Sequence, residues 1–386
     1  MMTRTFYEFF AGGGMARAGL GPGWRCLFAN EIDKKKAACY RANFGGEELA
    51  VGDVSCLTVP DLPETPDLVW ASFPCQDLSL AGNGAGLRGN RSGTFWPFWR
   101  LIERLCQENR APRLVVLENV CGTLRSHNGK DFAAIVDSLA TAGYRAGALV
   151  LDAVHFLPQS RPRLFIVAAL NGLAIPPGLS SVAPDPQCTT QALNEAHAKL
   201  PNETKDRWIW WTLPEPRKAK RRLSDLIEDE PTGVQWHSQE ETQRLLGLMS
   251  ELNRRKVKLK KVESKRTGRC VVGTIYKRTR EDETGNKQQR AEVRFDEIAG
   301  CLRTPVGGSS RQTIVVIEPD RVRSRLLSPR EAARLMGLPD DYRLPERYNE
   351  AYQLAGDGLA VPVVRHLAEH LLEPLLARSD RSAKAA

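Results

Sequence analysis

Short apolar segments alternate with amphipathic ones along the first 170 residues of the chain. Apolar runs of strand length are found at residues 4–10, 24–29, 67–71, 114–117 and 164–170. Apolar positions that recur with a helical period are found at residues 95–107 and 132–142. Strands that alternate with helices are typical of an α/β fold with a doubly wound sheet, in which ligands bind at the carboxyl ends of the strands.

The pattern changes after about residue 171, where proline, polar and charged residues dominate and the alternation is lost until about residue 302. Within this region residues 277–290 have the composition of a polar loop. The pattern therefore predicts a smaller, irregular domain between two parts of the larger one. The predicted segments are a first domain at 1–170, the irregular domain at 171–305 and a return segment at 306–386.

Two helices are expected in the return segment. Ser328 can cap the first of them, because Pro329 suits the first helical position and Glu331 stands three residues after the cap. Gly337 is expected to end this helix. The last helix is expected over residues 361–376, where it completes the first domain.

The charge balance favours a polyanionic partner. The 386 residues are 42% hydrophobic and hold 55 Lys and Arg against 46 Asp and Glu, which gives a formal charge of +9. A pI of 9.1 suits nucleic acid, although a merely basic protein would have the same balance.

The nine cysteines are scattered through the chain, with no Cys-x-x-Cys pair and no histidine at the spacing of a metal ligand. This spacing argues against a zinc site and against a disulfide framework, and unpaired thiols are typical of a reducing compartment. No apolar run reaches about 18 residues, and the N-terminus lacks the apolar core of a signal peptide. We therefore expect no metal, no membrane segment and a cytoplasmic protein.

Residues with ligand-binding chemistry follow the predicted strands. A glycine turn at 11–14 comes after the first strand and opens a helix, which lets backbone N–H groups approach a ligand closely. Glu31 stands about 20 residues further on, where a carboxylate can accept hydrogen bonds from ribose hydroxyls. Asp53 follows another short apolar run, and it either meets an adenine amino group or caps a helix.

Cys75 is the candidate nucleophile. The apolar run 67–71 leads to Pro74 and Cys75, and the glycine-rich stretch 81–89 that follows has the composition of a lid. A single cysteine near a turn can also be a core residue, but the fixed backbone and the glycine-rich stretch favour a thiol that attacks an electron-poor carbon. The five residues Gly12, Glu31, Asp53, Cys75 and Glu118 all fall at the carboxyl ends of predicted strands.

Aromatic and basic residues alternate in the irregular region. Trp208, Trp210, Trp211 and Trp236 lie near the basic runs 217–222 and 254–261. Basic runs beside aromatic residues suit phosphate contacts and the reading of base edges. A solvated helix face is the alternative for the second run.

These residues resemble the cytosine-C5 DNA methyltransferase family of bacterial or phage type. The motifs stand in the usual order of the family and extend from Thr5 to about Leu376, interrupted by residues 171–300. They are Phe10-Ala11-Gly12-x-Gly14 with Gly19, Asn30-Glu31-Ile32-Asp33, Gly52-Asp53, Phe73-Pro74-Cys75-Gln76, Glu118-Asn119-Val120, Gln159-Ser160-Arg161-Pro162-Arg163, Ser328-Pro329-Arg330-Glu331 through Gly337-Leu338-Pro339, and Gln353 to Leu359.

The resemblance implies a Rossmann-like sheet that binds S-adenosylmethionine, with S-adenosylhomocysteine as the product. Phe10 and Ile32 would contact the adenine, Glu31 the ribose and Asp53 the adenine amino group. The full set of implied cofactor residues is Phe10, Ala11, Gly12, Gly13, Gly14, Glu31, Ile32, Asp53, Val54, Pro74, Asp357 and Leu359.

The resemblance also implies how cytosine is methylated. Cys75 would attack C6 of a flipped-out cytosine, Glu118 would hydrogen-bond N3, and Arg161 with Arg163 would hold the base and phosphate side of the pocket. Residues 171–300 would read the target sequence. The residues expected to contact DNA are Gln76, Ser79, Arg88, Arg91 and Thr304.

Two departures from the family pattern leave alternatives open. Met15 stands where a second glycine is usual, and Asp357 replaces the usual asparagine near the methionine end of the cofactor. Asp357 raises the alternative of a catalytically silent DNA-binding protein. A tRNA cytosine-C5 methyltransferase shares the motifs and the overall size, and an NAD-dependent dehydrogenase could have the glycine turn and Glu31. For the cytosine-C5 DNA methyltransferase we expect a monomer that binds double-stranded DNA, with its substrate in the bacterial nucleoid. A cognate restriction endonuclease is a possible partner.

Overall fold

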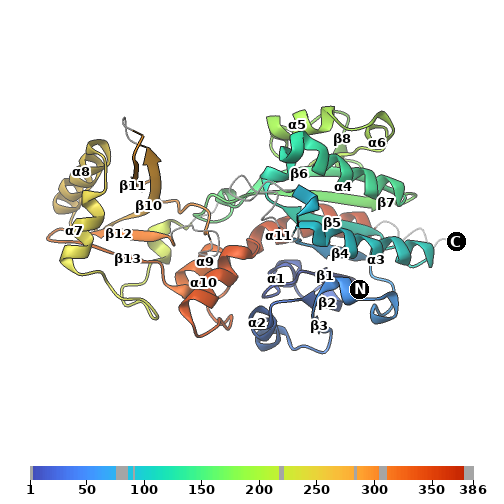
Figure 1. The fold of residues 1–386 in the computed structure, drawn as a ribbon, viewed down its shortest axis with the longest axis horizontal. Coiled ribbons are helices and arrows are strands. Elements are labelled where there is room, and N and C mark those ends of the chain that lie inside the picture. Colours follow the sequence, from blue (N-terminus) through green and yellow to red (C-terminus); the bar gives the residue numbers. More distant parts are fainter. Residues whose placement is uncertain are drawn as a thin grey trace. The chain divides into compact units, whose positions relative to one another are not determined.

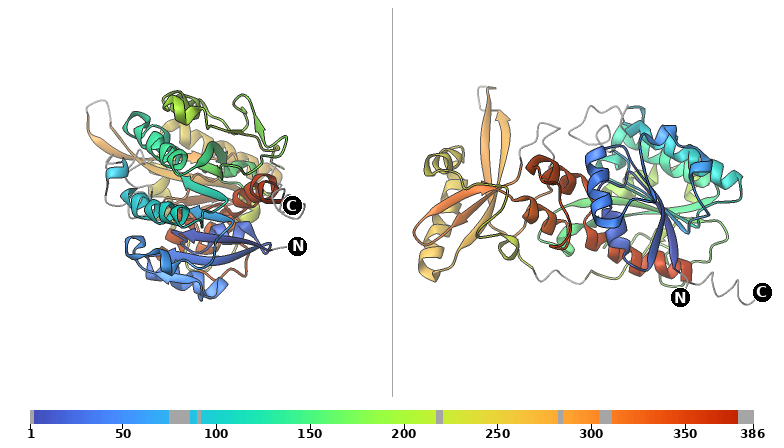
Figure 2. Two further views of the ribbon diagram at one scale, coloured as in Figure 1. Left: turned by 90° about the vertical axis from the view of Figure 1, so that its right-hand side faces the viewer. Right: turned by 90° about the horizontal axis from the view of Figure 1, so that it is seen from below.

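The computed structural model describes residues 3–74, 86–89, 92–216, 221–281, 285–303 and 311–377. The chain divides into two compact units (Figures 1 and 2). The first unit comprises residues 1–152, 162–216 and 359–386, and the second comprises residues 153–161 and 217–358. These divisions differ from the boundaries expected at 170 and 305, because residues 171–216 pack with the first unit and residues 311–358 with the second.

A seven-stranded sheet of order β3-β2-β1-β4-β5-β7-β6 forms the centre of the first unit. Strand β7 runs antiparallel to both of its neighbours, while β1 to β5 pair in parallel. The strands are β1 (Arg4–Phe9), β2 (Trp24–Glu31), β3 (Leu49–Val51), β4 (Leu68–Ala71), β5 (Leu114–Asn119), β6 (Tyr144–Asp152) and β7 (Pro162–Leu170). Their parallel core is buried on both faces, which explains the continuous apolar runs in the sequence.

Helices cover both faces of this sheet, as a doubly wound fold requires (Figure 1). Helices α3 and α4 pack on the face that carries Tyr7 and Phe9, while α2 packs on the opposite face and α1 packs against α11. The helices of the first unit are α1 (Met15–Leu20), α2 (Lys34–Phe44), α3 (Phe95–Gln107), α4 (Lys130–Thr141), α5 (Gln191–Ala198), α6 (Asn202–Lys205) and α11 (Val361–Leu367), which continues through a π-helical turn, Ala368–Leu372.

Residues 171–216 extend the first unit beyond β6. Their packing shows that the role expected for three tryptophans is wrong. The Ile209 N–H donates to the Ala146 carbonyl at 2.9 Å, and the Trp211 indole N–H donates to the Val167 carbonyl at 3.0 Å. Gly147 allows this approach, since a Cβ there would lie 1.9 Å from the Ile209 carbonyl oxygen. Trp208, Trp210 and Trp211 therefore pack beside the sheet, with Trp211 in the core, instead of reading base edges. The short strands β8 (Ser180–Ser181) and β9 (Trp210–Trp211) pair in this segment.

The second unit is built on a four-stranded antiparallel sheet of order β11-β10-β12-β13. Leu245 of α7, Met249 between the two helices and Val257 of α8 are buried in one core with Ile275 and Val315 of this sheet. The elements are β10 (Val271–Glu281), β11 (Lys287–Arg294), β12 (Thr313–Ile317), β13 (Val322–Leu326), α7 (Gln239–Gly247), α8 (Glu251–Thr267), α9 (Pro329–Leu335) and α10 (Tyr348–Asp357). The prediction of a polar loop at 277–290 is wrong for residues 277–281 and 287–290, which lie in strands β10 and β11 of a hairpin.

The capping box predicted for α9 is confirmed. The Glu331 N–H donates to the Ser328 hydroxyl at 3.1 Å, and the Ser328 N–H donates back to the Glu331 carboxylate at 2.7 Å. The same carboxylate accepts two hydrogen bonds from Arg325, each 2.7 Å long, and both side chains are fully buried. Gly337 follows the helix with φ +78°, in the left-handed region that favours glycine.

Candidate active site

The strand register brings the candidate residues of the first unit to one edge of the sheet. Phe9 lies opposite Asn30 of β2 and Ala71 of β4, and Ala71 lies opposite Leu117 of β5. The residues that follow these positions therefore share that edge. Arg163 joins them because β7 begins there, running antiparallel to β5.

The turn after β1 is open to a ligand. Phe10 and Gly12 both adopt positive φ, +58° and +57°, so the chain reverses sharply at the strand end. A Cβ placed on Gly12 would meet no atom within 4 Å, whereas one on Gly14 would lie 2.6 Å from the Phe44 ring. The turn thus packs at Gly14 and presents bare backbone at Gly12.

Glu31 is held in place by two backbone donors. Its carboxylate accepts from the Gly12 N–H and from the Asp33 N–H, both at 2.7 Å, and the residue is 6% exposed. A carboxylate offers about four acceptor positions, so capacity remains for hydroxyl groups. Ile32 beside it is 62% exposed and offers an apolar surface. Together with the open turn, these features fit an adenosine-containing cofactor.

Asp53 caps a short 3-10 turn, Val54–Cys56, which is the structural alternative foreseen for it. Its carboxylate accepts from the Ser55 N–H at 2.8 Å, and this hydrogen bond lowers the pKa of Asp53. Val54 is buried behind it. The cap fixes where the carboxylate lies after β3.

Part of the predicted site lies outside the described residues. These positions are Cys75, Gln76, Ser79, Arg91 and Thr304; of Arg88 only the backbone is described, in the turn Gly86–Arg88. Residues on both sides of this gap are fixed. The Pro74 carbonyl accepts from the Ser92 hydroxyl at 2.9 Å, and the Phe73 carbonyl accepts from the Asn119 side chain at 3.1 Å. The backbone immediately before Cys75 is therefore tied to β5 and to Ser92.

Asn119 received no role of its own from the sequence. Its Oδ1 accepts from the Val120 N–H at 2.9 Å and from the Thr123 hydroxyl at 3.2 Å, while its Nδ2 reaches Phe73. The residue is 4% exposed. It links the ends of β4 and β5, so it positions the segment that leads to Cys75. An amide directly after Glu118 at a strand end was the available signal.

Glu118 and Arg163 form a nearly buried ion pair. The Arg163 Nε lies 3.3 Å from the Glu118 Oε1, and the two side chains are 16% and 10% exposed. In such a setting the pair is only weakly screened by water. The charge of Arg163 also acts on nearby Cys121. Burial raises the pKa of Cys121, and the positive charge of Arg163 opposes the increase.

Arg161 and Asp357 belong to the second unit, whereas Arg163 belongs to the first. Arg161 is 2% exposed and donates to the carbonyls of Gly356 and Gly358 at 2.8 and 2.7 Å, and to the Cys301 sulfur at 3.2 Å. It therefore holds the turn around Asp357. The exposed Asp357 ends α10 and accepts from the Gln353 amide at 3.5 Å. Leu359 begins the last segment of the first unit and is buried.

Glu8 is a site-adjacent residue that the sequence analysis missed. It is 1% exposed in β1, and its carboxylate accepts from the backbone N–H groups of Ala16 and Arg17. Burial raises the pKa of Glu8 to about 8, against the opposing charge of Arg17. It thus anchors α1 to the strand beneath the glycine turn. An acid within the apolar run 4–10 was the signal that could have found it.

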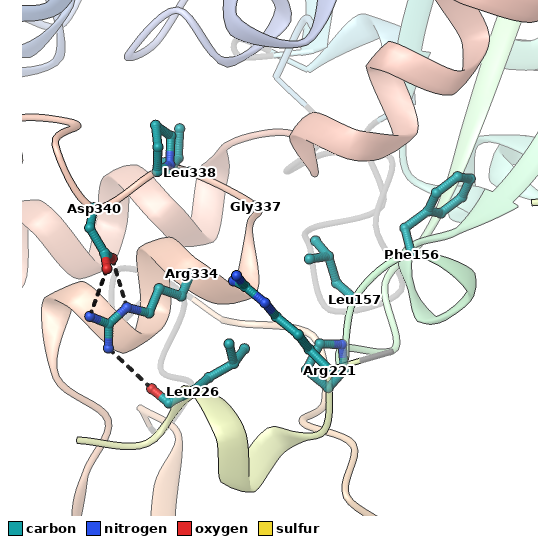
Figure 3. Close-up of a pocket in the computed structure, with 10 residues that line it drawn as sticks. Phe156, Leu157, Arg221, Leu226, Arg334, Gly337, Leu338 and Asp340 are labelled. Carbon is teal, nitrogen blue, oxygen red and sulfur yellow. Dashed lines mark hydrogen bonds and ion pairs between the residues drawn. The ribbon is translucent and has the colours of Figure 1, made fainter. Parts of the chain in front are cut away.

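The second unit contains a pocket apart from these residues. A cavity of about 440 Å³ is lined by Phe156, Leu157, Leu226 and Leu338 together with Arg221 (Figure 3). Arg334 in its wall is bound to Asp340 by two hydrogen bonds of 2.7 and 3.1 Å, which hold the pKa of Asp340 below its usual range. None of the candidate catalytic or cofactor residues lines this pocket.

The sheet order with antiparallel β7, the glycine turn after β1 and the acid at the end of β2 define an S-adenosylmethionine-dependent methyltransferase. No helix in the described ranges is long and apolar enough to cross a membrane. The sequence model of the C-5 cytosine-specific DNA methylase family matches residues 4–373, and the chain belongs to that family. It is a DNA cytosine-C5 methyltransferase that uses S-adenosylmethionine as its methyl donor.

Similar proteins support this placement. Type II methyltransferase M.NlaX of Neisseria lactamica is 28% identical over 379 residues, which cover 97% of this chain and 98% of that protein. Type II methyltransferase M.HaeII of Haemophilus aegyptius is 28% identical over 373 residues, covering 95% and 92%. Among solved structures, the S. pombe Dnmt2 methyltransferase has a TM-score of 0.60 at 17% identity, covering 97% of this chain and 99% of that one. This last similarity concerns the fold.

Proposed function

We propose that the enzyme methylates a flipped-out cytosine in duplex DNA through a transient bond between Cys75 and C6 of the base. The observation that carries the proposal is the shared sheet edge. There Asn119 fixes the backbone that leads to Cys75, and Glu118 lies beside Arg163. A nucleophile and a base-binding carboxylate that follow neighbouring strands can reach one pyrimidine ring.

The donor site is assigned to the edge formed by the glycine turn and the end of β2. Gly12 would accept close approach of the cofactor, Glu31 would bind its ribose hydroxyls, and Ile32 would cover its adenine. S-adenosylmethionine supplies the methyl group when bound. Asp53, Leu359 and Asp357 complete the expected set, and the effect of Asp357 on the methionine end is a prediction of this assignment.

The residues of the chain would activate the acceptor. The Cys75 thiolate adds to C6, and the ring electrons that this addition displaces make C5 nucleophilic. Glu118 hydrogen-bonds N3 and offsets the charge that builds up on the ring, while the cationic Arg163 favours the thiolate and orients Glu118. After C5 is methylated, loss of its proton restores the double bond and expels the thiolate.

The acceptor base must leave the helix before this chemistry. C6 is covered in a stacked duplex, and extrusion of the base costs a few kcal/mol. DNA contacts by Gln76, Ser79, Arg88, Arg91 and Thr304 would offset this cost. The second unit, with residues 217–303, would select the target sequence.

A trapping experiment tests the covalent route. Duplex DNA that contains 5-fluorocytosine lacks the removable C5 proton, so we expect it to form a stable adduct with the wild-type chain and S-adenosylmethionine. Peptide mapping should place the adduct on Cys75, and Cys75→Ser should form no adduct while it still binds DNA. An adduct on another cysteine, or full methylation by Cys75→Ser, would reject the proposal. A tRNA acceptor run in parallel tests the alternative substrate.

We further infer that the enzyme acts as a monomer in a bacterial cytoplasm and protects DNA from a cognate restriction endonuclease. The relatives that carry the name Type II methyltransferase, from Neisseria and Haemophilus, support this context. Genomic DNA from cells that express the chain should resist an endonuclease of matching specificity. Bisulfite sequencing of the same DNA would give the target, and absence of any methylated cytosine would contradict the proposal.

A further inference from the structure

The β10–β11 hairpin extends beyond the sheet that supports it. Strand β10 pairs with β12 only from Val271 to Ile275, but it pairs with β11 as far as Glu281. Apart from β10, strand β11 pairs within the described ranges with Met249, through Ala291. Residues 278–281 and 287–290 therefore form a two-stranded ribbon, about 13 Å long at about 3.3 Å per residue. Figures 1 and 2 show this hairpin projecting from the second unit.

The ribbon has no stabilising core of its own. Its residues 287–290 are exposed, and it contains no large apolar side chain. Arg278 lies directly opposite Arg290, and like charges in that position destabilise a strand pair. The ion pair between Arg278 and Glu292, 3.3 Å apart, offsets only part of this repulsion. An isolated two-stranded ribbon is marginal in water, so a negatively charged partner would stabilise this one.

The chemistry of one ribbon face fits the edges of DNA bases. Cross-strand partners share a face, and side chains alternate along each strand, so Arg278, Arg290 and Gln288 belong to the same face. Arginine pairs bidentately with guanine in the major groove, and glutamine pairs bidentately with adenine. Two strands about 4.8 Å apart fit a groove about 12 Å wide.

Building on the proposed function, in which duplex DNA is the substrate, we propose that the β10–β11 ribbon enters the major groove of the target. Arg278, Arg290 and Gln288 are then specificity-determining residues that read base edges. The chemistry of the ribbon favours DNA over a protein partner, because its exposed face carries guanidinium and amide groups but no large apolar side chain that could anchor a protein.

Helix α8 provides a matched control within the same unit. Its exposed Lys258, Lys261 and Lys265 lie along one line of the helix, at spacings of three and four residues. Lysine is a point charge on a flexible stem, which suits a phosphate but not a particular base. Neutralising the three lysines of α8 removes three positive charges, which equals the net charge of ribbon residues 278–281 and 287–290, without removing a forked side chain.

The experiment selects sequences from a randomised duplex library with the purified full-length chain. We expect Arg290→Lys and Gln288→Ala each to lose roughly 10-fold to 100-fold discrimination at one base pair, with little change in affinity for other sequences. Arg290→Lys keeps the charge and removes only the fork. The α8 variant Lys258→Gln/Lys261→Gln/Lys265→Gln should weaken binding to all sequences, lower the salt dependence and leave the sequence preference unchanged.

Several results would overturn the ribbon assignment. Ribbon variants that keep the wild-type preference would do so, as would a uniform loss of affinity for every sequence. A changed oligomeric state in size-exclusion chromatography with unchanged DNA preference would assign the ribbon to a protein interface instead. Binding selection separates this test from the proposed function. A wild-type chain that selects a sequence but transfers no methyl group to it would contradict the proposed function and leave the ribbon assignment standing.

Discussion

The two large sheets, one in each unit, differ in how much of their surface is buried. The mostly parallel sheet of the first unit is covered on both faces, and its candidate residues occupy strand ends that hydrogen bonds fix in position. The antiparallel sheet of the second unit has a small core and an exposed, charged hairpin. Chemistry needs groups held within fractions of an ångström, whereas recognition of DNA needs polar groups exposed to the partner. Burial and exposure in the two sheets follow this division.

The comparison has a direct consequence for mutants. Substitutions at the edge of the first sheet should change turnover and leave the DNA sequence preference intact. Substitutions in the antiparallel sheet of the second unit should change DNA selection or stability, and leave the chemical step intact once DNA is bound.

The largest effect is expected from Glu118→Gln. This change keeps the shape of the side chain but removes the group that can share a proton with N3, and general acid and base contributions are worth about 10²- to 10⁴-fold in rate. We expect kcat to fall by that amount, while affinity for DNA changes little. Glu369→Gln is the control, since Glu369 is a half-exposed helix residue of the same unit. Equal activity of Glu118→Gln and wild type in a single-turnover assay would remove Glu118 from the mechanism.

Glu331→Ala tests how the second unit is held together. The change leaves the fully buried Arg325 without its carboxylate partner, and breaking such a pair costs about 3–5 kcal/mol. Denaturant unfolding should show that loss, whereas Glu369→Ala, which breaks a solvent-exposed pair with Arg365, should cost less than about 1 kcal/mol. A similar small loss of unfolding free energy in both variants would mean that the buried pair stabilises the fold no more than the exposed pair does.

The contrast between the sheets also explains what the sequence could predict. Strand β4 is apolar throughout, and β1 and β5 are mostly apolar, because both of their faces are buried. The local run of apolar residues therefore indicates where these strands lie. Helix α3 was predicted at its observed bounds, Phe95–Gln107, because its apolar face repeats with a helical period. The motifs at the strand ends followed from the same pattern.

The failures have a physical cause as well. The β10–β11 ribbon is exposed on both faces, so no alternation of apolar and polar residues marks it as a strand. Strand β6 was not predicted, since small residues such as Gly147 replace bulky ones where residues 208–211 lie against it. The tryptophans of that segment pack on the sheet, and the sequence gives no local signal for such a long-range contact. Glu8 and Asn119 act through backbone groups of other elements, the start of α1 and the segment after β4.

Asn119→Ala tests the link between β4 and β5. The change removes the hydrogen bond to the Phe73 carbonyl and so loosens the segment that leads to Cys75. Misplacement by about 1 Å can cost roughly 10²-fold in rate, so we expect kcat to fall by about that factor with a nearly unchanged KM for the cofactor. Adduct formation with 5-fluorocytosine DNA should slow in parallel. A variant that loses stability but keeps its kcat would show that Asn119 supports the fold alone.

The smallest effect is expected from the ionisation of Glu8. Its pKa of about 8 in the folded chain lies above the ordinary value of 4.5, so the folded state keeps a proton that the unfolded state has released between these values. The stability of the wild type should therefore fall as the pH rises toward 8, by about 2 kcal/mol between pH 6 and 8, and level off above it. Glu8→Gln cannot ionise, and its free energy of unfolding should lack this component across the same range. The surrounding groups Arg17, Glu31, Cys26 and Tyr40 remain in both proteins, so the difference between the two curves isolates Glu8. Parallel curves for the two proteins would mean that Glu8 is already ionised at neutral pH, with Arg17 and the start of α1 stabilising its charge.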